Sequence, residues 1–303
     1  MTTIPDLKPM PQSERTRSPQ ELKIQREQRR GAIIRYVVLT AFGLLMLYPL
    51  IWLVGASFKT NEEIFSSAAF WPKDPTIQGY IDGWQTSTPY TFARFFMNSL
   101  YIVIPKMLGT AFSSVIVAYG FARFDFPGKK ILFGILIATL LLPDVVTRIP
   151  QYLLFRELGW LDTYLPLFVP QWFALEAFFV FMLIQFMRSI PRDMEEAARV
   201  DGANTFQVLW YVVVPMLMPA IISVCLFQFM WTMNDFLGPL IYISSVENYP
   251  VSLALKLSID TTEAFNWNQI LAMTVLALAP SLIVFFIAQK YFIEGISTGG
   301  VKG

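Results

Sequence analysis

The sequence contains no histidine and a single cysteine, Cys225. The missing histidines exclude zinc sites and nucleophilic triads that need an imidazole, and one cysteine cannot form an intramolecular disulfide. Charge is also scarce, since 15% of the 303 residues are Asp, Glu, Lys or Arg, against about 25% in soluble domains. The 23 basic and 22 acidic residues nearly cancel, which gives no overall field for nucleic acid. We therefore expect no catalytic residue, no metal site and no nucleic-acid partner.

Apolar residues make up 55% of the chain. Two stretches of nineteen residues, Tyr36–Val54 and Ile270–Ala288, carry no charge at all, and each approaches the ~20 residues that a helix needs to cross the hydrocarbon core. Four weaker stretches lie between them and are interrupted by Lys106, Pro143-Asp144, Glu176 or Asn234-Asp235. The sequence predicts an all-α integral membrane protein with six spans, at about 36–57, 100–122, 131–152, 165–187, 215–243 and 270–290.

Basic residues are distributed unevenly between the predicted loops. Sixteen of the 23 lie in the N-terminal tail 1–35, in the loop after the second span, in the loop 188–214 and at the C-terminal end, which holds Lys290 and Lys302. The positive-inside rule therefore places both termini in the cytoplasm and makes residues 36–293 the membrane domain. Lys106, within the second span, is expected to extend its ammonium toward the membrane surface.

The cytoplasmic loop 188–214 is long and patterned like a helix. Pro191 suits a first helical turn, and Gly202 after Asp201 suits a left-handed stop, which predicts about eleven helical residues. The acidic side chains Asp193, Glu195 and Glu196 complement the positive end of such a helix.

The pair Ala197-Ala198 has no bulk, so another protein could approach this backbone closely while Glu196 accepts its hydrogen bonds. We therefore predict that this helix docks against a partner. The alternative, a helix lying on lipid, usually has a basic polar face and large apolar anchors, whereas this helix is acidic and small.

A spaced motif runs through this loop. Glu196-Ala197-Ala198, three residues, Gly202, nine residues and then Val212-x-Val214-Pro215 resembles the EAA loop, E-A-A-x3-G-x9-I-x-L-P, of ABC importer permeases. The segments Gln185–Pro191, Trp231–Leu240 and Thr298–Gly303 resemble the MalG-like half of maltose-type carbohydrate importers. The resemblance implies a six-helix, MetI-like type I importer permease in the bacterial inner membrane.

The same resemblance implies a role for the loop and a set of partners. Residues Arg192 to Thr205 would form the coupling helix seated in an ATPase subunit, and the tail from Ser297 would reach toward the ATPase dimer. The coupling residues would be Arg192, Glu195, Glu196, Ala197, Ala198, Asp201, Gly202 and Pro215. The implied partners are a MalF-like second permease, two MalK-like subunits that hold ATP and Mg, an external solute-binding protein and a carbohydrate.

A phosphate-binding loop is absent, because no G-x-x-x-x-G-K-[ST] occurs in the sequence. The chain is therefore expected to hold no cofactor and to depend on separate ATPase subunits.

Polar side chains within spans are costly and tend to face a bundle interior or an aqueous path. Gln228, Trp231, Asp235 and Gly238 have the spacing of one helical face, which would suit sugar hydroxyls and the apolar side of a pyranose ring. Bonding between helices is the competing explanation. The candidates for the substrate path are Glu176, Gln228, Trp231, Asn234 and Asp235, and an oligosaccharide is the favoured substrate.

Two other classes of protein remain open at this stage. An ion-coupled transporter or channel could use Glu176 and Asp235 as a cation site, but it leaves the acidic loop helix unexplained. An intramembrane enzyme would need facing catalytic groups, and Asp144 and Asp235, the Asp residues at span ends, lie in no recognisable catalytic context.

Overall fold

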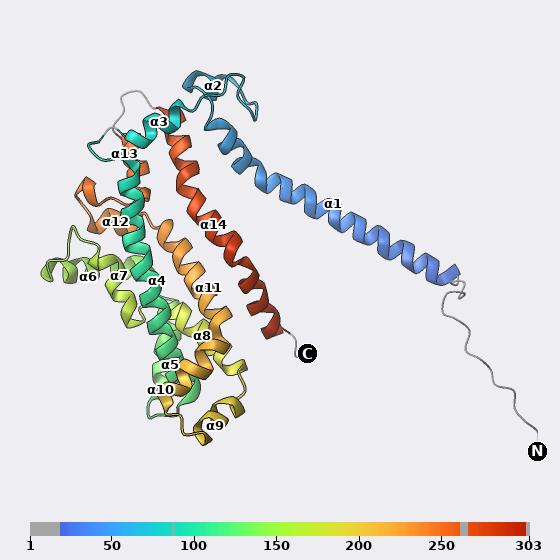
Figure 1. Ribbon diagram of the computed structural model, residues 1–303, viewed down its shortest axis with the longest axis vertical. Coiled ribbons are helices and arrows are strands. Elements are labelled where there is room, and N and C mark those ends of the chain that lie inside the picture. The colour runs from blue at the N-terminus through green and yellow to red at the C-terminus, as the bar shows by residue number, and fades with distance from the viewer. Residues whose placement is uncertain (1–18, 87, 261–265, 301–303) are drawn as a thin grey trace, which may run out of the picture. The chain divides into compact units, whose positions relative to one another are not determined.

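The computed structural model describes residues 19–86, 88–260 and 266–300, and every regular element within them is a helix (Figure 1). The chain forms two compact units, Met1–Leu53 and Val54–Gly303. The first predicted span lies in α1, Pro19–Ala56, whose segment Gln28–Ala56 is long and apolar enough to cross a membrane. The predicted tail 1–35 is thus helical from Pro19 onward, and its first eighteen residues lie outside the described part.

Three long helices form the frame of the second unit. They are α4, Phe92–Arg123, α11, Val214–Met233, and α14, Trp267–Gly300. Helix α11 packs against α4 on one side and α14 on the other. Helices α4 and α14 contain the predicted spans 100–122 and 270–290, whereas the predicted span 215–243 is too long at its end, because α11 stops at Met233. The C-terminal tail predicted from residue 294 continues α14 as far as Gly300.

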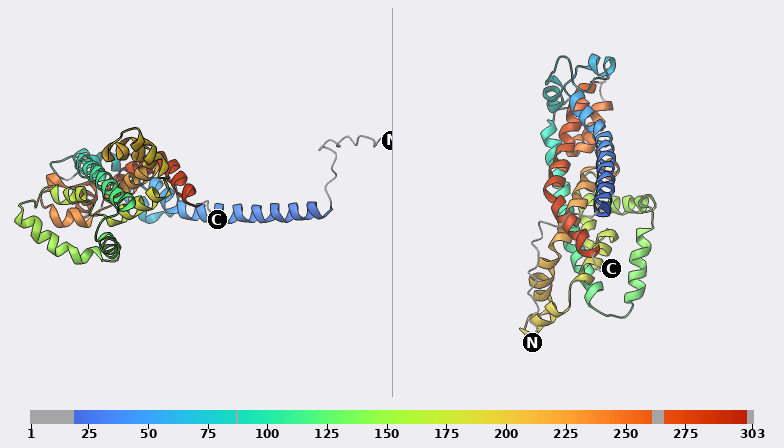
Figure 2. Two further views of the ribbon diagram at one scale, coloured as in Figure 1. Left: turned by 90° about the horizontal axis from the view of Figure 1, so that it is seen from below. Right: turned by 90° about the vertical axis from the view of Figure 1, so that its right-hand side faces the viewer.

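The third predicted span, 131–152, is a bent pair of helices and not one rod. Helix α5, Lys129–Leu140, is followed by α6, Asp144–Glu157, and the two axes differ by 102° (Figure 2, right). Pro143 stands at the break in extended conformation, and proline also disfavours helical geometry in the residue before it. The described chain thus has five helices of membrane-spanning length and composition, or six if this pair is one span.

The fourth predicted span, 165–187, is also interrupted. It consists of α7, Leu165–Phe168, the 3-10 turn η2, Val169–Phe173, and α8, Ala177–Ser189. Ala174 between η2 and α8 has a positive φ of 55°, which a helix cannot continue through. Glu176 therefore lies at the break directly before α8, and it is near the middle of the span candidate Leu165–Ser189, as the hydropathy pattern predicts.

Shorter elements gather at the two ends of the second unit (Figure 1). One end carries α9, Asp193–Val200, and α10, Thr205–Val208, which leads through the π-helical turn η3, Leu209–Val213, into α11. The other end carries α2, Asn61–Ser66, α3, Gln78–Gln85, and α13, Val251–Asp260. Helix α12, Leu237–Tyr242, and the turn η4, Val246–Asn248, follow α11 after a break at residues 234–236.

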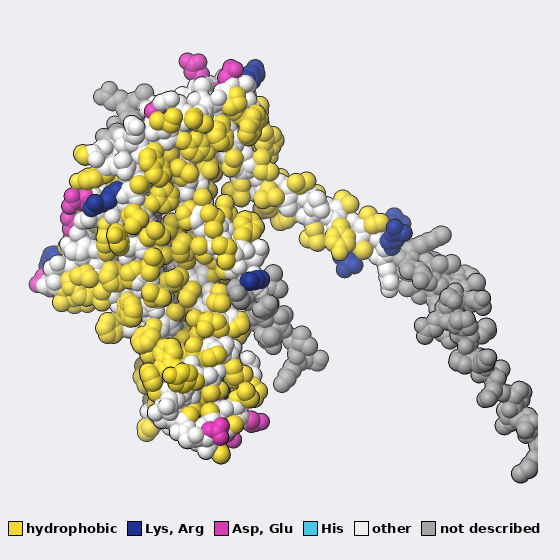
Figure 3. All heavy atoms as spheres, in the orientation of Figure 1, with side chains coloured by type: hydrophobic (Ala, Val, Ile, Leu, Met, Phe, Trp, Pro, Cys, Tyr) yellow, Lys and Arg dark blue, Asp and Glu magenta, His cyan; other side chains and the backbone are white. Residues whose placement is uncertain are grey.

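The core lies where α4 meets α8 and α11. Val115, Ala118, Leu183, Leu217 and Val224 are among its buried side chains. Small residues on α4 allow this close approach, as is common between helices in membranes, and the Ser113 hydroxyl donates to the Gln171 carbonyl of η2 at 2.7 Å. On the face drawn in Figure 3, hydrophobic side chains cover most of the middle of the second unit, and acidic side chains lie at the ends that carry α9 and α2 and along the left edge.

Candidate functional site

Helix α9 is fixed at both ends by local hydrogen bonds. The Arg192 carbonyl accepts from the Glu195 and Glu196 amides, and α9 closes where the Gly202 amide donates to the Arg199 carbonyl and the Ala203 amide to the Ala198 carbonyl. This pair of bonds is a Schellman cap, which needs a left-handed residue at the Gly202 position, and Gly202 has a φ of 93°. The predicted glycine stop is therefore confirmed.

The helix is shorter than predicted. It covers the eight residues Asp193–Val200, not eleven, and does not run from Arg192 to Thr205. A separate helix, α10, starts at Thr205, because Asn204 and Gln207 form a reciprocal capping box that begins a new helix there.

Glu195 joins α9 to the bundle. Its carboxylate forms an ion pair with the Arg123 guanidinium, at 2.5 Å between Oε1 and Nε, and the two side chains are 5% and 4% exposed. Arg123 lies in the last turn of α4 and also donates from Nη2 to the Ile190 carbonyl before α9. The sequence had grouped Glu195 with the residues that face a partner, but the structure turns it inward.

The opposite face of α9 is open. Glu196 and Ala197 are exposed, as are the helix-end residues Arg192 and Asp201, while Ala198 is half-buried against the core. Val200 is 87% exposed, although an aliphatic side chain of this size usually finds cover. An exposed acidic and small surface with an uncovered apolar residue is what the docking prediction requires.

Pro215 lies at the start of α11, directly after the π-helical turn η3. Proline has no amide hydrogen to donate to the carbonyl four residues earlier, and a π-turn is one way in which a continuous helix accommodates that gap. Pro215 is exposed and shapes the path from the loop into the bundle.

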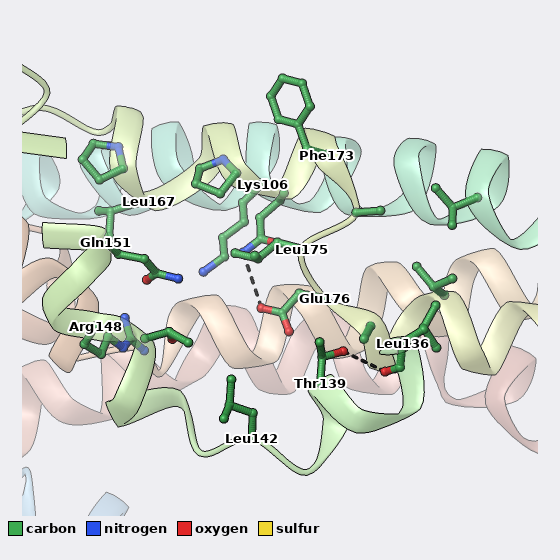
Figure 4. Close-up of a pocket in the computed structure, with 18 of the residues that line it drawn as sticks. Lys106, Leu136, Thr139, Leu142, Arg148, Gln151, Leu167, Phe173, Leu175 and Glu176 are labelled. Carbon is green, nitrogen blue, oxygen red and sulfur yellow. Dashed lines mark hydrogen bonds between the residues drawn. The ribbon is translucent and has the colours of Figure 1, made fainter. Parts of the chain in front are cut away.

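A second feature is a cavity of about 650 Å³ between the bent pair α5–α6 and the bundle. Its charged lining residues are Lys106, Arg148, Glu176 and Asp235, and Gln151, Gln171, Thr139 and Thr147 add uncharged polar groups. Figure 4 shows Lys106, Arg148, Gln151 and Glu176 pointing toward one another from α4, α6 and the start of α8. Phe121, Phe155 and Phe173 are among its apolar walls.

An ion pair and hydrogen bonds connect the polar groups of the cavity. Lys106 and Asp235 form an ion pair at 4.0 Å, with 12% and 22% of their side chains exposed, so Lys106 pairs inside the protein and does not extend to the membrane surface. Gln171 Nε2 donates to Glu176 at 3.4 Å. Asp235 Oδ1 accepts from the Gly238 amide in the first turn of α12 at 3.0 Å.

Glu176 and Asp235 thus lie in one cavity, whereas the other three path candidates do not line it. Gln228 is 1% exposed and bonds to Thr232 within its own helix. Trp231 packs on Phe179 with ring centres 5.0 Å apart, and the Asn234 amide caps its helix at the Met230 carbonyl. Because α11 ends at Met233, the helical face expected from Gln228 to Gly238 does not form.

Sequence reasoning missed several cavity residues. Arg148 and Gln151 are three residues apart, which places them on one face of a helix. The apolar stretch that contains them was used only to predict a span, and not a polar site. Gln171 and Thr139 carry no signal of their own in the sequence, since isolated polar residues in apolar stretches are common. Thr139 lies near the end of α5 and Gln171 in η2, and the fold brings both to the cavity.

Residues 111–298 match the family described as binding-protein-dependent transport system inner membrane component. The chain belongs to this family. The match extends from the middle of α4 into α14 and includes the α9 loop and nearly all of the cavity lining. As a family member, the chain is a multi-pass permease subunit of the bacterial inner membrane, and the predicted all-helical permease fold is confirmed.

Individual relatives cover almost the whole chain. It is 28% identical to the probable ABC transporter permease protein YurM of Bacillus subtilis, with 94% of each chain aligned. It is 29% identical to the arabinooligosaccharides transport system permease protein AraQ of the same organism, over 88% of this chain and 96% of AraQ. A permease chain from the crystal structure of a bacterial ABC transporter that imports the acidic polysaccharide alginate superimposes with a TM-score of 0.77, at 25% identity over 88% of this chain and 98% of that one.

Proposed function

We propose that this permease is one half of the membrane channel of an ATP-driven importer that takes up an oligosaccharide. The support comes from its relatives, which include permeases named for the transport of arabinooligosaccharides, galactooligosaccharides and diacetylchitobiose. The four charged residues of the cavity support a hydrophilic cargo, because ionised groups are costly inside a membrane unless they serve a polar path.

The observation that carries the coupling mechanism is the two-sided arrangement of α9. Its inner side is fixed to α4 through Glu195 and Arg123, while Glu196 and Ala197 on its outer side stay exposed. A helix that is rigidly attached to the bundle and open on the other side can transmit a partner's movement to α4. Closure of an ATPase dimer would then shift the bundle between states with different access, provided that the partner contacts differ between the states.

The proposal requires four further components outside this chain. Two ATP-binding subunits would hold ATP and Mg and contact α9 on each permease, a second permease would complete the channel, and a solute-binding protein would deliver the sugar. A chain with the same fold occurs in the crystal structure of a bacterial alginate ABC transporter in complex with an alginate pentasaccharide-bound periplasmic protein, which supports the solute-binding protein as a partner. The charge distribution favours a cytoplasmic location for α9 and for both termini.

The test is to purify the complete transporter and replace Glu196 by lysine. The variant is expected to lose ATPase subunits during purification and to lose ATP hydrolysis stimulated by the loaded solute-binding protein. The reason is that lysine replaces a hydrogen-bond acceptor by a donor, which cannot bond to the donors of the partner. Glu157→Lys is the matched control, since Glu157 is an exposed α6 glutamate far along the chain from the loop, and it should keep both properties.

Either of two results would overturn the proposal. One is a Glu196→Lys transporter that keeps its ATPase subunits and its stimulation. The other is solute movement by reconstituted vesicles on an ion gradient alone with no ATPase subunit present, which would favour the ion-coupled alternative.

A further inference from the structure

The charges that line the cavity between α5–α6 and the bundle cancel. Lys106 and Arg148 contribute two positive groups, and Glu176 and Asp235 contribute two negative groups. No other Lys, Arg, Asp or Glu belongs to the lining in the part of the chain that the structure describes. The four residues come from four separate segments, which are α4, α6, the start of α8 and the turn after α11. The balance is therefore a property of the assembled fold and not of one helix.

The balanced groups are also partly removed from water, since Arg148 and Glu176 are half-buried. Lys106 and Asp235 are paired, with 12% and 22% of their side chains exposed, and Glu176 accepts from Gln171, a residue that is 5% exposed. Coulomb interactions are stronger in such surroundings than in bulk water. An entering ion of either sign would meet no net charge of the opposite sign here, because the two cations and the two anions of the lining cancel.

An uncharged sugar matches this lining better than an ion does. Each hydroxyl both donates and accepts hydrogen bonds, and the cavity offers cationic donors and carboxylate acceptors together. Gln151, Thr139 and Thr147 add neutral polar groups, while aromatic walls suit the apolar faces of sugar rings. The volume of about 650 Å³ lies within the range of small-molecule sites.

We propose that this cavity is a binding site, within this subunit, for an uncharged stretch of oligosaccharide. The balance of Lys106 and Arg148 against Glu176 and Asp235 makes it reject anionic sugars, including alginate, the acidic polysaccharide that the importer of its structural relative takes up. Rejection arises from the lack of an uncompensated cation and not from a steric barrier. The assignment rests on the proposed function, since it names the class of substrate that the importer carries.

The test places a thiol reporter in the cavity of the complete transporter. Thr139→Cys is made in a Cys225→Ala background, because Thr139 is exposed toward the cavity and Cys225 is the single native cysteine. The rate at which an uncharged methanethiosulfonate reagent labels this thiol is measured in the presence of arabinotriose, galactotriose, diacetylchitobiose or alginate pentasaccharide. At least one neutral sugar is expected to slow labelling about threefold at twice its Kd, and the pentasaccharide to leave the rate unchanged.

A charge variant tests the cause of the selectivity. Glu176→Gln leaves one uncompensated cation, so labelling by an anionic reagent should accelerate about tenfold relative to a cationic one, and alginate pentasaccharide should begin to protect the thiol. Glu157→Gln makes the same change of charge outside the cavity and should match the parent.

Three results would each overturn the inference. The first is that no neutral sugar protects the thiol, and the second is that the pentasaccharide protects the parent as well as a neutral sugar does. The third is that Glu176→Gln leaves the ratio of the labelling rates of the two charged reagents unchanged. Stimulated ATP hydrolysis, measured in the same preparation, reports separately on the proposed function.

Discussion

Arg123 at the end of α4 and Glu195 in the first turn of α9 form an ion pair in which both side chains are at least 95% buried. Removing one partner of such a pair leaves an uncompensated charge and costs ~3–5 kcal/mol, whereas replacing both by apolar groups is often close to neutral. Glu195→Gln and Arg123→Met are therefore each expected to lower the free energy of unfolding by about that amount, measured in mixed detergent micelles.

The double variant Arg123→Met/Glu195→Leu separates the charge effect from a general loss of packing. It should recover more than half of the stability lost in either single variant. Stimulated ATP hydrolysis should fall in the single variants, because α9 is no longer fixed to α4. If the free energy of unfolding of the single variants stays within ~0.5 kcal/mol of the parent, the buried-pair interpretation is contradicted, because a change of that size is typical of surface substitutions.

Gly202 offers a test of the α9 stop. Its φ of 93° is unfavourable for a residue with a side chain, and an added Cβ would meet no atom within 4 Å, so the effect of Gly202→Ala is backbone strain alone. We expect a loss of ~1 kcal/mol or more in stability and a smaller loss for Gly202→Asn, because asparagine tolerates the left-handed region better. Thermal unfolding of the purified transporter provides the measurement.

Gly120 is the matched control for that experiment. It lies inside α4, and its added Cβ would likewise meet nothing within 4 Å. Gly120→Ala should stabilise the protein slightly, since alanine is favoured over glycine in a helix by ~1 kcal/mol. Opposite signs at the two glycines are the expected result, and equal effects would mean that the left-handed conformation at Gly202 carries no strain.

The spans were predictable because membrane thickness fixes their length, and that constraint acts on local sequence alone. Tyr36–Val54 and Ile270–Ala288 each fall inside a helix of the expected kind. The breaks were harder to predict. A left-handed Ala174 has no sequence signature, since it is held by the contacts of η2 and α8, and hydropathy averages over such a point.

The candidate site was predictable only where it is local. Gly202 and the acidic turn of α9 follow from helix capping, which needs neighbours in sequence. Glu195 and Glu196 are adjacent and chemically alike, so the sequence could not decide which one faces the bundle until the position of Arg123 was known. The cavity combines Lys106, Arg148 and Asp235 from distant segments, and only the assembled fold brings them together.

Lys59, at the end of the second unit opposite to α9, tests how much a buried cation contributes to the stability of the protein. Its side chain is fully buried, and its ammonium donates to the carbonyls of Ser67 and Ala69 at 2.9 and 2.7 Å. Lys59→Met would leave both carbonyls without these donors, so we expect a loss of ~2 kcal/mol or more. Lys73→Met, at an exposed side chain nearby, should stay within ~0.5 kcal/mol of the parent, and equal losses would contradict this assignment.

The hydrogen bonds of Asp162 to Ser244 and Ser245 should make the stability of this loop depend on pH. Its carboxylate accepts from the Ser245 hydroxyl, from the Ser245 amide at 2.8 Å and from the Ser244 amide at 3.0 Å. These bonds, with that of the Ser245 side chain first, lower the pKa of Asp162 below its usual value. A carboxyl whose pKa is lower in the folded state adds stability above the unfolded pKa of ~3.9 and loses it as the pH falls through the folded pKa.

The measurement is the hydrogen-exchange protection of the Ser244 and Ser245 amides, corrected for the intrinsic rate at each pH. Protection should be high at neutral pH and fall in acid below the unfolded pKa of ~3.9. Asp162 has a positive φ of 60°, which asparagine also tolerates, so Asp162→Asn removes the charge with little added strain. This variant should have weaker protection at neutral pH and no change in acid, because no titrating group remains. Equal acid sensitivity in the variant would assign the pH dependence to another group.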